Sequence, residues 1–116
     1  MLKIDENNNI LLTRGDSAEL ELTVKDEDNN DYDYSNDVVK FGVKRSALDK
    51  TEPMLKKTFD ENGKIYFAPE DTENMEFGDY LYDVEISHTE GEGEEAVTTV
   101  TTVIAAAKFS IGWNVL

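Results

Sequence analysis

At 116 residues, of which 39% are apolar and 32% charged, the chain has the length and composition of one soluble domain with a single hydrophobic core. Its 26 acidic and 11 basic side chains give a formal net charge of −15, which argues against nucleic acid or an anionic membrane surface as a partner. The charge is compatible with a basic protein partner or a bound cation, and the absence of cysteine excludes disulfides and thiolate metal sites.

Neither end of the sequence has the pattern of a targeting or membrane segment. The first ten residues lack the apolar run of a secretory signal, and the weakly polar stretch 103–116 is interrupted by Lys108 and too short to cross a bilayer. No repeat or linker composition divides the chain. We therefore expect residues 1–116 to form a single domain that stays in the cytoplasm unless an assembly carries it outside.

Strands are predicted in the first half of the chain, where apolar and polar residues alternate with a period of two. The first strand covers residues 10–12, the second 18–26 and the third 38–46. The side chains of the second and third strands that we expect in the core are Leu20, Leu22, Val24, Val39, Phe41 and Val43.

Two further strands surround an Asn62-Gly63 dipeptide, which is a strong signal for a tight hairpin turn. Residues 55–59 form the strand that leads into the turn, and residues 64–68 form the strand that leaves it. The latter strand is expected to supply Ile65 and Phe67 to the core. The segment 69–77 then predicts a single helical turn.

Residues 78–87 predict a strand in which Tyr80, Tyr82, Val84 and Ile86 share one face. In immunoglobulin-like sandwiches, a tyrosine near the start of a late strand buries its ring, and its hydroxyl bonds to the backbone a few residues upstream. Tyr80, directly after Gly78-Asp79, fits this tyrosine corner. A tyrosine pair that stacks on sugar rings would require the rings to point outward, and we favour burial because Val84 and Ile86 share their face.

The last predicted strand, 96–111, is rich in β-branched residues and follows an acidic hairpin tip at 88–95. A break or bulge is expected near its alanines, with Phe109 and Ile111 continuing beyond it. Trp113 either closes the core or belongs to a surface that faces a partner, and we favour the core. Together the segments predict an all-β, immunoglobulin-like β-sandwich of about seven strands.

The acidic loop 26–37 contains part of a calcium-binding pattern. Asp26, Asp28, Asn30 and Asp37 occupy the first, third, fifth and twelfth positions of the calcium-loop template. Asp31, however, stands where the template requires glycine, and no helical pattern flanks the loop. We favour a solvated loop whose charges prevent edge-to-edge strand pairing, and leave open whether it binds a cation.

Other short patterns have ordinary structural explanations. Arg14-Gly15-Asp16 spells the integrin-binding tripeptide, but Gly-Asp between two strands is common turn chemistry. Gly91 and Gly93 lie among glutamates that would repel phosphate.

The sequence contains few residues in patterns typical of a catalytic site. His88 is the only histidine and is expected at an exposed hairpin position. None of the serines has the glycine frame of a nucleophile: Ser17, Ser35, Ser46, Ser87 and Ser110. We expect no enzyme, and hence no catalytic, cofactor-binding or metal-binding residues.

Four signatures in chain order carry a family resemblance: Gly15-Asp16-Ser17, Val39-x-Phe41-x-Val43-Lys44, Gly78-x-Tyr80-x-Tyr82-Asp83-Val84, and Thr102-Val103-Ile104 with Phe109. Over nearly the whole chain they resemble the N-terminal immunoglobulin-like domains of baseplate and tail-fibre proteins from phages and prophages of Gram-positive bacteria. The chain departs from that family at Ala107, where a glycine usually precedes the final aromatic residue. The resemblance implies no catalytic residues and implies docking within a virion.

We therefore expect a non-enzymatic structural or adaptor protein of a phage tail tip, baseplate or fibre, found in the virion and, when expressed, in the bacterial host cytoplasm. Its partners would be other phage structural proteins, with self-association into a homo-oligomer left open. One alternative is a carbohydrate-binding module, with or without calcium, that uses exposed rings among Tyr32, Tyr34, Tyr66 and Trp113. Another is an acidic mimic of DNA that binds a host protein.

Overall fold

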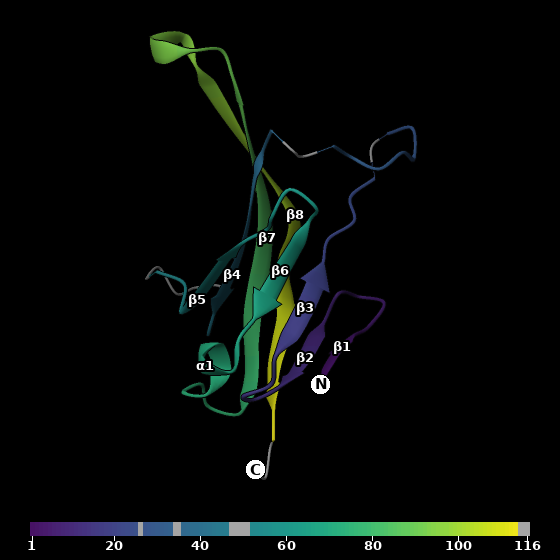
Figure 1. The fold of residues 1–116 in the computed structure, drawn as a ribbon, viewed down its shortest axis with the longest axis vertical. Coiled ribbons are helices and arrows are strands. Elements are labelled where there is room, and N and C mark those ends of the chain that lie inside the picture. The colour runs from purple at the N-terminus through teal and green to yellow at the C-terminus, as the bar shows by residue number, and fades with distance from the viewer. Residues whose placement is uncertain (26, 34–35, 47–51, 114–116) are drawn as a thin grey trace.

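The structure is a computed structural model that describes residues 1–25, 27–33, 36–46 and 52–113. Strands make up 54% of the chain and there is almost no helix, which confirms the prediction of an all-β fold (Figure 1). The strands are β1 (Leu2–Ile4), β2 (Ile10–Thr13), β3 (Ala18–Glu21), β4 (Val38–Lys44), β5 (Leu55–Thr58), β6 (Lys64–Phe67), β7 (Gly78–Glu90) and β8 (Val97–Gly112). A short helix α1 (Pro69–Thr72) precedes β7, and a 3₁₀ turn η1 (Gly93–Glu95) joins β7 to β8.

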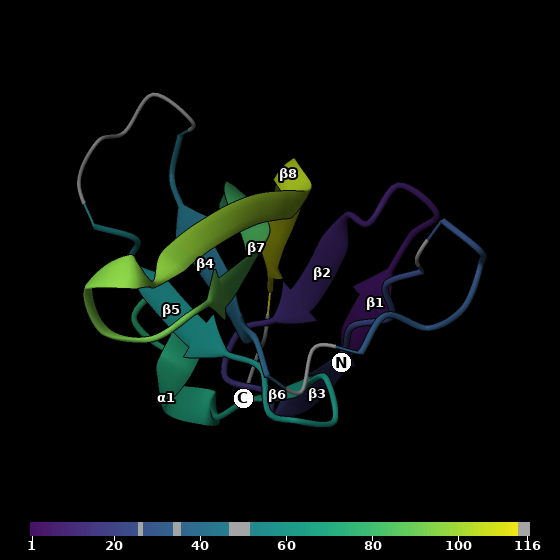
Figure 2. The same ribbon diagram turned by 90° about the horizontal axis from the view of Figure 1, so that it is seen from above.

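The strands form one large curled sheet and one small sheet. The large sheet has the order β1-β2-β8-β7-β4-β5, in which β2 and β8 run parallel and the other neighbours run antiparallel. The small sheet pairs β3 with β6 antiparallel. Seen along the long axis, β3 and β6 lie across the open side of the curled sheet (Figure 2). The core fills the space between the two sheets.

Aromatic rings from both sheets meet in the centre of this core. The ring centroid of Phe41 on β4 lies 5.6 Å from that of Phe67 on β6, 5.1 Å from that of Tyr82 and 5.8 Å from that of Phe109. The other buried hydrophobic residues are Ile10, Leu12, Leu20, Val39, Val43, Leu55, Phe59, Ile65, Tyr80, Val84, Ile86 and Ile111. Of the residues that the strand patterns predicted for the core, all are therefore buried apart from Leu22 and Val24, while Trp113 beyond the last strand is exposed.

The second predicted strand is shorter in the structure than in the prediction. β3 ends at Glu21, which pairs with Lys64, the first residue of β6. One more backbone hydrogen bond follows, from the N–H of Leu22 to the carbonyl of Gly63 at 2.8 Å, where the turn before β6 begins. Leu22 and Val24 follow the strand and are only partly buried against the core.

The Asn62-Gly63 turn forms, but the strands on either side of it are not a hairpin. Gly63 has φ 74°, and its N–H donates to the carbonyl of Asp60 at 3.0 Å. β5 nevertheless pairs with β4, while β6 pairs with β3. Because Phe59 and Ile65 are both buried, the chain wraps around the core at this turn and passes from one sheet to the other.

The predicted irregularity near the alanines of β8 is confirmed. Tyr82 pairs with Ala107 and Val84 with Ile104, so Asp83 lies opposite two residues, which is a β-bulge. Its carboxylate accepts a hydrogen bond from the N–H of Ala106. Ala106 has φ 50°, a left-handed conformation that favours glycine.

Replacing Ala106 with glycine is expected to raise the free energy of unfolding by about 0.5–1 kcal/mol, because it removes the clash of a Cβ atom in the left-handed region. Ala105→Gly is the matched control, since Ala105 is also exposed on β8, in the same bulge, but does not have a positive φ. The control should lower stability by about 0.5–1 kcal/mol. Urea denaturation measures both variants, and equal destabilisation by the two would contradict the assigned backbone conformation.

Candidate functional surfaces

The two tyrosines of β7 belong to the scaffold. Tyr80 is 2% exposed, and its hydroxyl donates to the carbonyl of Glu76 at 2.9 Å, which confirms the tyrosine corner. The hydroxyl of Tyr82 donates to the carbonyl of Asn8, and burial raises the pKa of Tyr82 to about 12. Both rings point inward, so neither is available to stack on a sugar.

The Arg14-Gly15-Asp16 segment is a turn between β2 and β3 that is bound to its own chain. Gly15 has φ 81°, and its N–H donates to Oγ1 of Thr72 on α1 at 2.8 Å. The guanidinium of Arg14 lies 4.2 Å from the ring centroid of Phe77. These contacts support the structural interpretation of the tripeptide.

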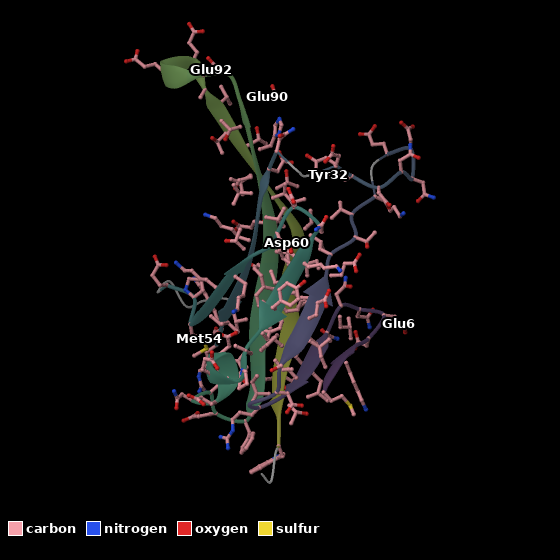
Figure 3. All side chains as sticks on the ribbon, viewed as in Figure 1. Glu6, Tyr32, Met54, Asp60, Glu90 and Glu92 are labelled. Atoms are coloured by element: carbon pink, nitrogen blue, oxygen red, sulfur yellow. The ribbon has the colours of Figure 1, made fainter. Side chains whose placement is uncertain are left out.

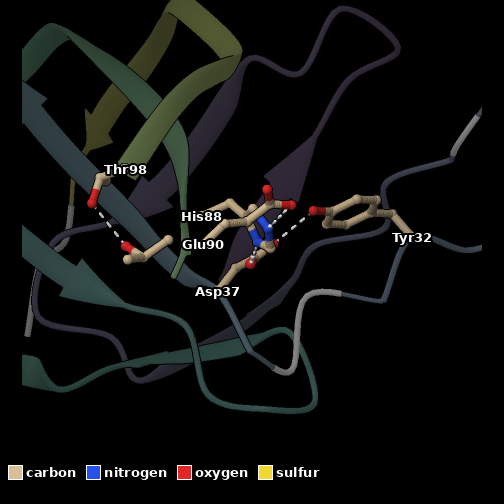
Figure 4. Close-up of polar contacts among 6 residues, drawn as sticks. Tyr32, Asp37, His88, Glu90 and Thr98 are labelled. Atoms are coloured by element: carbon tan, nitrogen blue, oxygen red, sulfur yellow. Dashed lines mark hydrogen bonds and ion pairs between the residues drawn. The ribbon is translucent and has the colours of Figure 1, made fainter. Parts of the chain in front are cut away.

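The acidic loop is joined to β7 by a cluster around Asp37 (Figure 4). The Asp37 side chain is 2% exposed, and its Oδ2 accepts a 2.6 Å hydrogen bond from the hydroxyl of Tyr32. The other oxygen, Oδ1, lies 2.5 Å from Nδ1 of His88. Nε2 of His88 lies 3.2 Å from Oε1 of Glu90. His88 lies on the β7–β8 hairpin with its side chain 42% exposed, as predicted, but the prediction did not foresee that a carboxylate 51 residues away approaches its ring.

This geometry bears on the calcium pattern. Asp37, the last residue of the template, is engaged by Tyr32 and His88, and Asp26, the first, lies outside the described residues. Over the described ranges, no three His, Asp or Glu side chains come close enough together to hold a metal ion. Both ring contacts of His88 are carboxylates, so the cluster resembles an ion pair that fixes the loop more than a nucleophile–base pair.

Charge interactions set the protonation of the cluster. The hydrogen bond to Asp37 and the contact with Glu90 raise the pKa of His88 above its ordinary value. Burial alone would raise the pKa of Asp37, but hydrogen bonds from Tyr32 and His88 outweigh it and hold that pKa below the usual range. At mildly acidic pH both members of the pair are therefore charged.

The stability added by the His88–Asp37 pair is expected to depend on pH. The raised pKa of His88 gives a contribution that is complete below its unfolded value and lost as pH rises through the folded value, whereas the lowered pKa of Asp37 gives one that is lost only in strong acid. The unfolding free energy of wild type should therefore exceed that of His88→Gln by more at about pH 5.5 than at about pH 9. Denaturation across this pH series tests the prediction, and a pH-independent difference would contradict it.

The aromatic rings considered for a sugar-binding site differ in exposure and in the contacts they make. Tyr66 on β6 is 57% exposed, Tyr32 is held by Asp37, and Tyr34 lies outside the described residues. Trp113 is 77% exposed and stacks on Phe77, with ring centroids 3.8 Å apart. The preference for Trp113 in the core is thus wrong, because β8 ends at Gly112 and the indole lies beyond the sheet.

A groove with basic side chains crosses the outer face of β7, β4 and β5. It has a volume of about 570 Å³ and is lined by Lys40, Lys44, Lys56 and Lys57 together with Asp83 and Glu85. Lys57 also forms a 2.7 Å ion pair with Asp71 of α1. Sequence reasoning missed this groove, although a signal was present in Lys40, Lys44 and Lys56, which occupy outward-facing positions of two strands that become neighbours.

The most unusual surface is the free edge of β8, which we define as residues 97–103. β7 pairs with β8 along its length, but β2 covers only Phe109–Gly112 on the other side. No other strand in the described part of the chain pairs with this edge. Val97 and Val100 on it are 64% and 56% exposed. The hairpin formed by β7 and β8 also extends well beyond the sheets, with Glu90 and Glu92 near its tip (Figures 1 and 3).

An open cleft of about 470 Å³, with both apolar and polar lining residues, adjoins the free edge of β8. Its lining includes Leu20, Leu22, Val24, Phe59, Val103 and Ile104. The sequence signal for the edge was an uncharged run of twelve residues, 96–107, in a chain that is 32% charged. We interpreted that run only as a strand, because the extent of β2 beside it is a property of the fold.

No family model, curated protein or solved structure matches the chain. Within the described ranges, no helix has the length and apolar character needed to span a membrane.

Proposed function

We propose that this protein is a non-enzymatic structural or adaptor protein of a phage or prophage virion, in the tail tip, baseplate or fibre, and that it acts through protein–protein assembly. The observation that carries the assembly role is the free, uncharged edge of β8 beside an open cleft. Unpaired backbone groups on an uncharged strand are a template for a further strand, and natural proteins normally protect such edges with charges or cover them. The phage setting rests on the sequence resemblance.

The proposal includes an immunoglobulin-like sandwich. In that fold, strands B and E pair in one sheet and strands C, F and G in the other. The pair β3–β6 and the row β4-β7-β8 have this order, and Tyr80 near the start of β7 has the position of the corner tyrosine of strand F. These correspondences support the assignment independently of the signatures in the sequence.

The experiment that tests the virion role uses particles from a lysogen that encodes the chain. After induction and density-gradient purification, quantitative mass spectrometry should find the chain at a constant ratio to the tail proteins across the particle peak. An abundant cytoplasmic host protein serves as the carry-over control. A chain that is expressed during induction but stays with the host proteins, away from the particles, would contradict the proposal.

The exposure of Trp113 favours a second candidate, a carbohydrate-binding surface. Its ring is 77% exposed and is supported from behind by Phe77, on which Arg14 also packs. Exposed aromatic rings of this kind can stack on apolar faces of sugars. Titration with host cell-wall glycans should then show binding that Trp113→Ala abolishes and that Tyr66→Ala retains; no binding by the wild type would remove this candidate.

A further inference from the structure

We propose that the free edge of β8 pairs with the same edge of a second copy of this chain, in an antiparallel dimer whose two-fold axis passes through Val100. The inference deepens the proposed function, because it rests on the protein acting through assembly and names one partner surface. Four properties of the edge support it: its symmetric sequence, its unpaired backbone, its lack of charge, and the positions where its regular strand structure begins and ends.

The free edge of β8 has a palindromic sequence. Residues 97–103 read Val-Thr-Thr-Val-Thr-Thr-Val, which is the same in both directions. A two-fold axis requires each residue to meet its symmetry mate, so that identical surfaces are self-complementary. Antiparallel pairing about Val100 places it opposite its own copy, Val97 opposite Val103, and threonines opposite threonines. Valine and threonine are favourable strand residues, and pairs of like β-branched side chains stabilise neighbouring strands.

The backbone of the edge is available for this pairing. Residues 97–102 make their ladder with β7 on one side, from Val97 opposite Glu90 to Thr102 opposite Glu85. On the other side, β2 is the strand that could cover them, but its first residue, Ile10, lies opposite Phe109 and the strand runs away from the free edge. Val97, Val100 and the threonines between them are exposed. A second copy would satisfy this row of backbone groups and would cover both valines.

Electrostatics permits two copies of this acidic chain to meet here. The segment carries no charge, although the whole chain has a net charge of −15. The glutamates of the hairpin tip lie next to Val97, and antiparallel pairing about Val100 places the two tips at opposite ends of the shared ladder. The tip glutamate nearest to the palindrome, Glu95, is then ten residue positions from its symmetry mate along the ladder. At about 3.4 Å per residue this is roughly 34 Å, well beyond the screening length of about 8 Å at physiological salt.

The regular strand structure of the free edge begins and ends at the same residues as the palindrome. Val103 has no partner on β7, because Val84 pairs with Ile104 and Glu85 with Thr102, and a second irregularity follows at Ala105–Ala106. Bulges of this kind twist a strand and end regular pairing. At the other end, β8 begins at Val97. The regular part of the free edge thus coincides with the palindrome, and Val103 and Ile104 at its end line the open cleft.

The first test measures self-association by sedimentation equilibrium of the whole chain. Wild type should dimerise, and Val100→Glu should raise the dimer dissociation constant by at least about tenfold, because two like charges then lie directly opposite each other. Val100→Lys should do the same alone, whereas an equal mixture of the two variants should regain a heterodimer. Val38→Glu, at an exposed valine of β4, is the matched control and should leave dimerisation unchanged.

The second test fixes the register, and it uses the absence of cysteine from the chain. Val100→Cys should form a disulfide-linked dimer on mild oxidation, since opposed antiparallel residues have Cα atoms about 4.5–5.5 Å apart. Val97→Cys alone should not crosslink, but its mixture with Val103→Cys should. Circular dichroism establishes that each variant is folded.

Two outcomes would overturn the inference: a wild type that stays monomeric at every concentration, or a dimer in which Val38→Cys crosslinks as readily as Val100→Cys. A monomeric wild type that is found in purified particles removes this dimer and leaves the virion role intact. A chain that dimerises in the predicted register but is absent from the particles would contradict the virion role and leave the dimer intact.

Discussion

Replacement of Phe41 with alanine is expected to lower the free energy of unfolding by about 3–5 kcal/mol. Phe41 is buried on β4 in the large sheet, and its ring meets Phe67 of the small sheet edge-on, with ring centroids 5.6 Å apart. It also contacts Tyr82 and Phe109, so its removal leaves a cavity where the two sheets join. Because domains of this size are stable by only about 5–15 kcal/mol, the loss would be a large share of the total.

Urea denaturation followed by circular dichroism measures this loss. Tyr66→Ala is the matched control, since it removes an aromatic ring from a strand of the small sheet but from its exposed face. We expect the control substitution to lower the free energy of unfolding by less than about 1 kcal/mol. If the two variants were equally stable, the aromatic cluster would not be what holds the sheets together.

Local features of the fold could be predicted because neighbouring residues determine them. The alternation in β4 and β7 identified which side chains are buried, since a strand turns successive side chains to opposite faces. Tyr80 was found in the same way, because the corner needs only a turn residue before it and a carbonyl four residues upstream. The single turn of α1 also has local causes: Pro69 starts it, and the Asp71 carboxylate accepts from the N–H of Ala68 at 2.8 Å.

Pairing between distant segments could not be predicted in this way. The Asn62-Gly63 signal specifies a reversal of the chain. Whether the flanking strands then pair with each other depends on which other strands lie beside them, and here β5 pairs with β4 and β6 with β3. Asp37 and His88 come together only because β4 and β7 are neighbours, with Val38 opposite Ser87.

The candidate surfaces depend on where strands end. Trp113 is exposed because β8 ends one residue before it, and the alternating pattern of that strand gave no sign of the end. The edge of β8 is free because β2 is only four residues long. The sequence contained the uncharged palindrome, but its meaning as a surface required the extents of both strands.

Replacement of Thr72 with valine is expected to lower the free energy of unfolding by about 1–3 kcal/mol, although the two side chains have nearly the same shape. Thr72 on α1 is fully buried, and its Oγ1 accepts a 2.8 Å hydrogen bond from the N–H of Gly15, 57 residues away in the chain. Valine has no acceptor, so that N–H would lose its partner.

Thr72→Ser is the matched control, because it keeps the acceptor and loses only a methyl group, at a cost of about 0.8 kcal/mol. Hydrogen exchange separates the two effects: the amide of Gly15 should lose protection in the valine variant and keep it in the serine variant. The turn between β2 and β3 would then be held by α1, which ties the start of the chain to the segment that precedes β7. A valine variant with wild-type stability and a protected Gly15 amide would show that the turn is held by its own backbone instead.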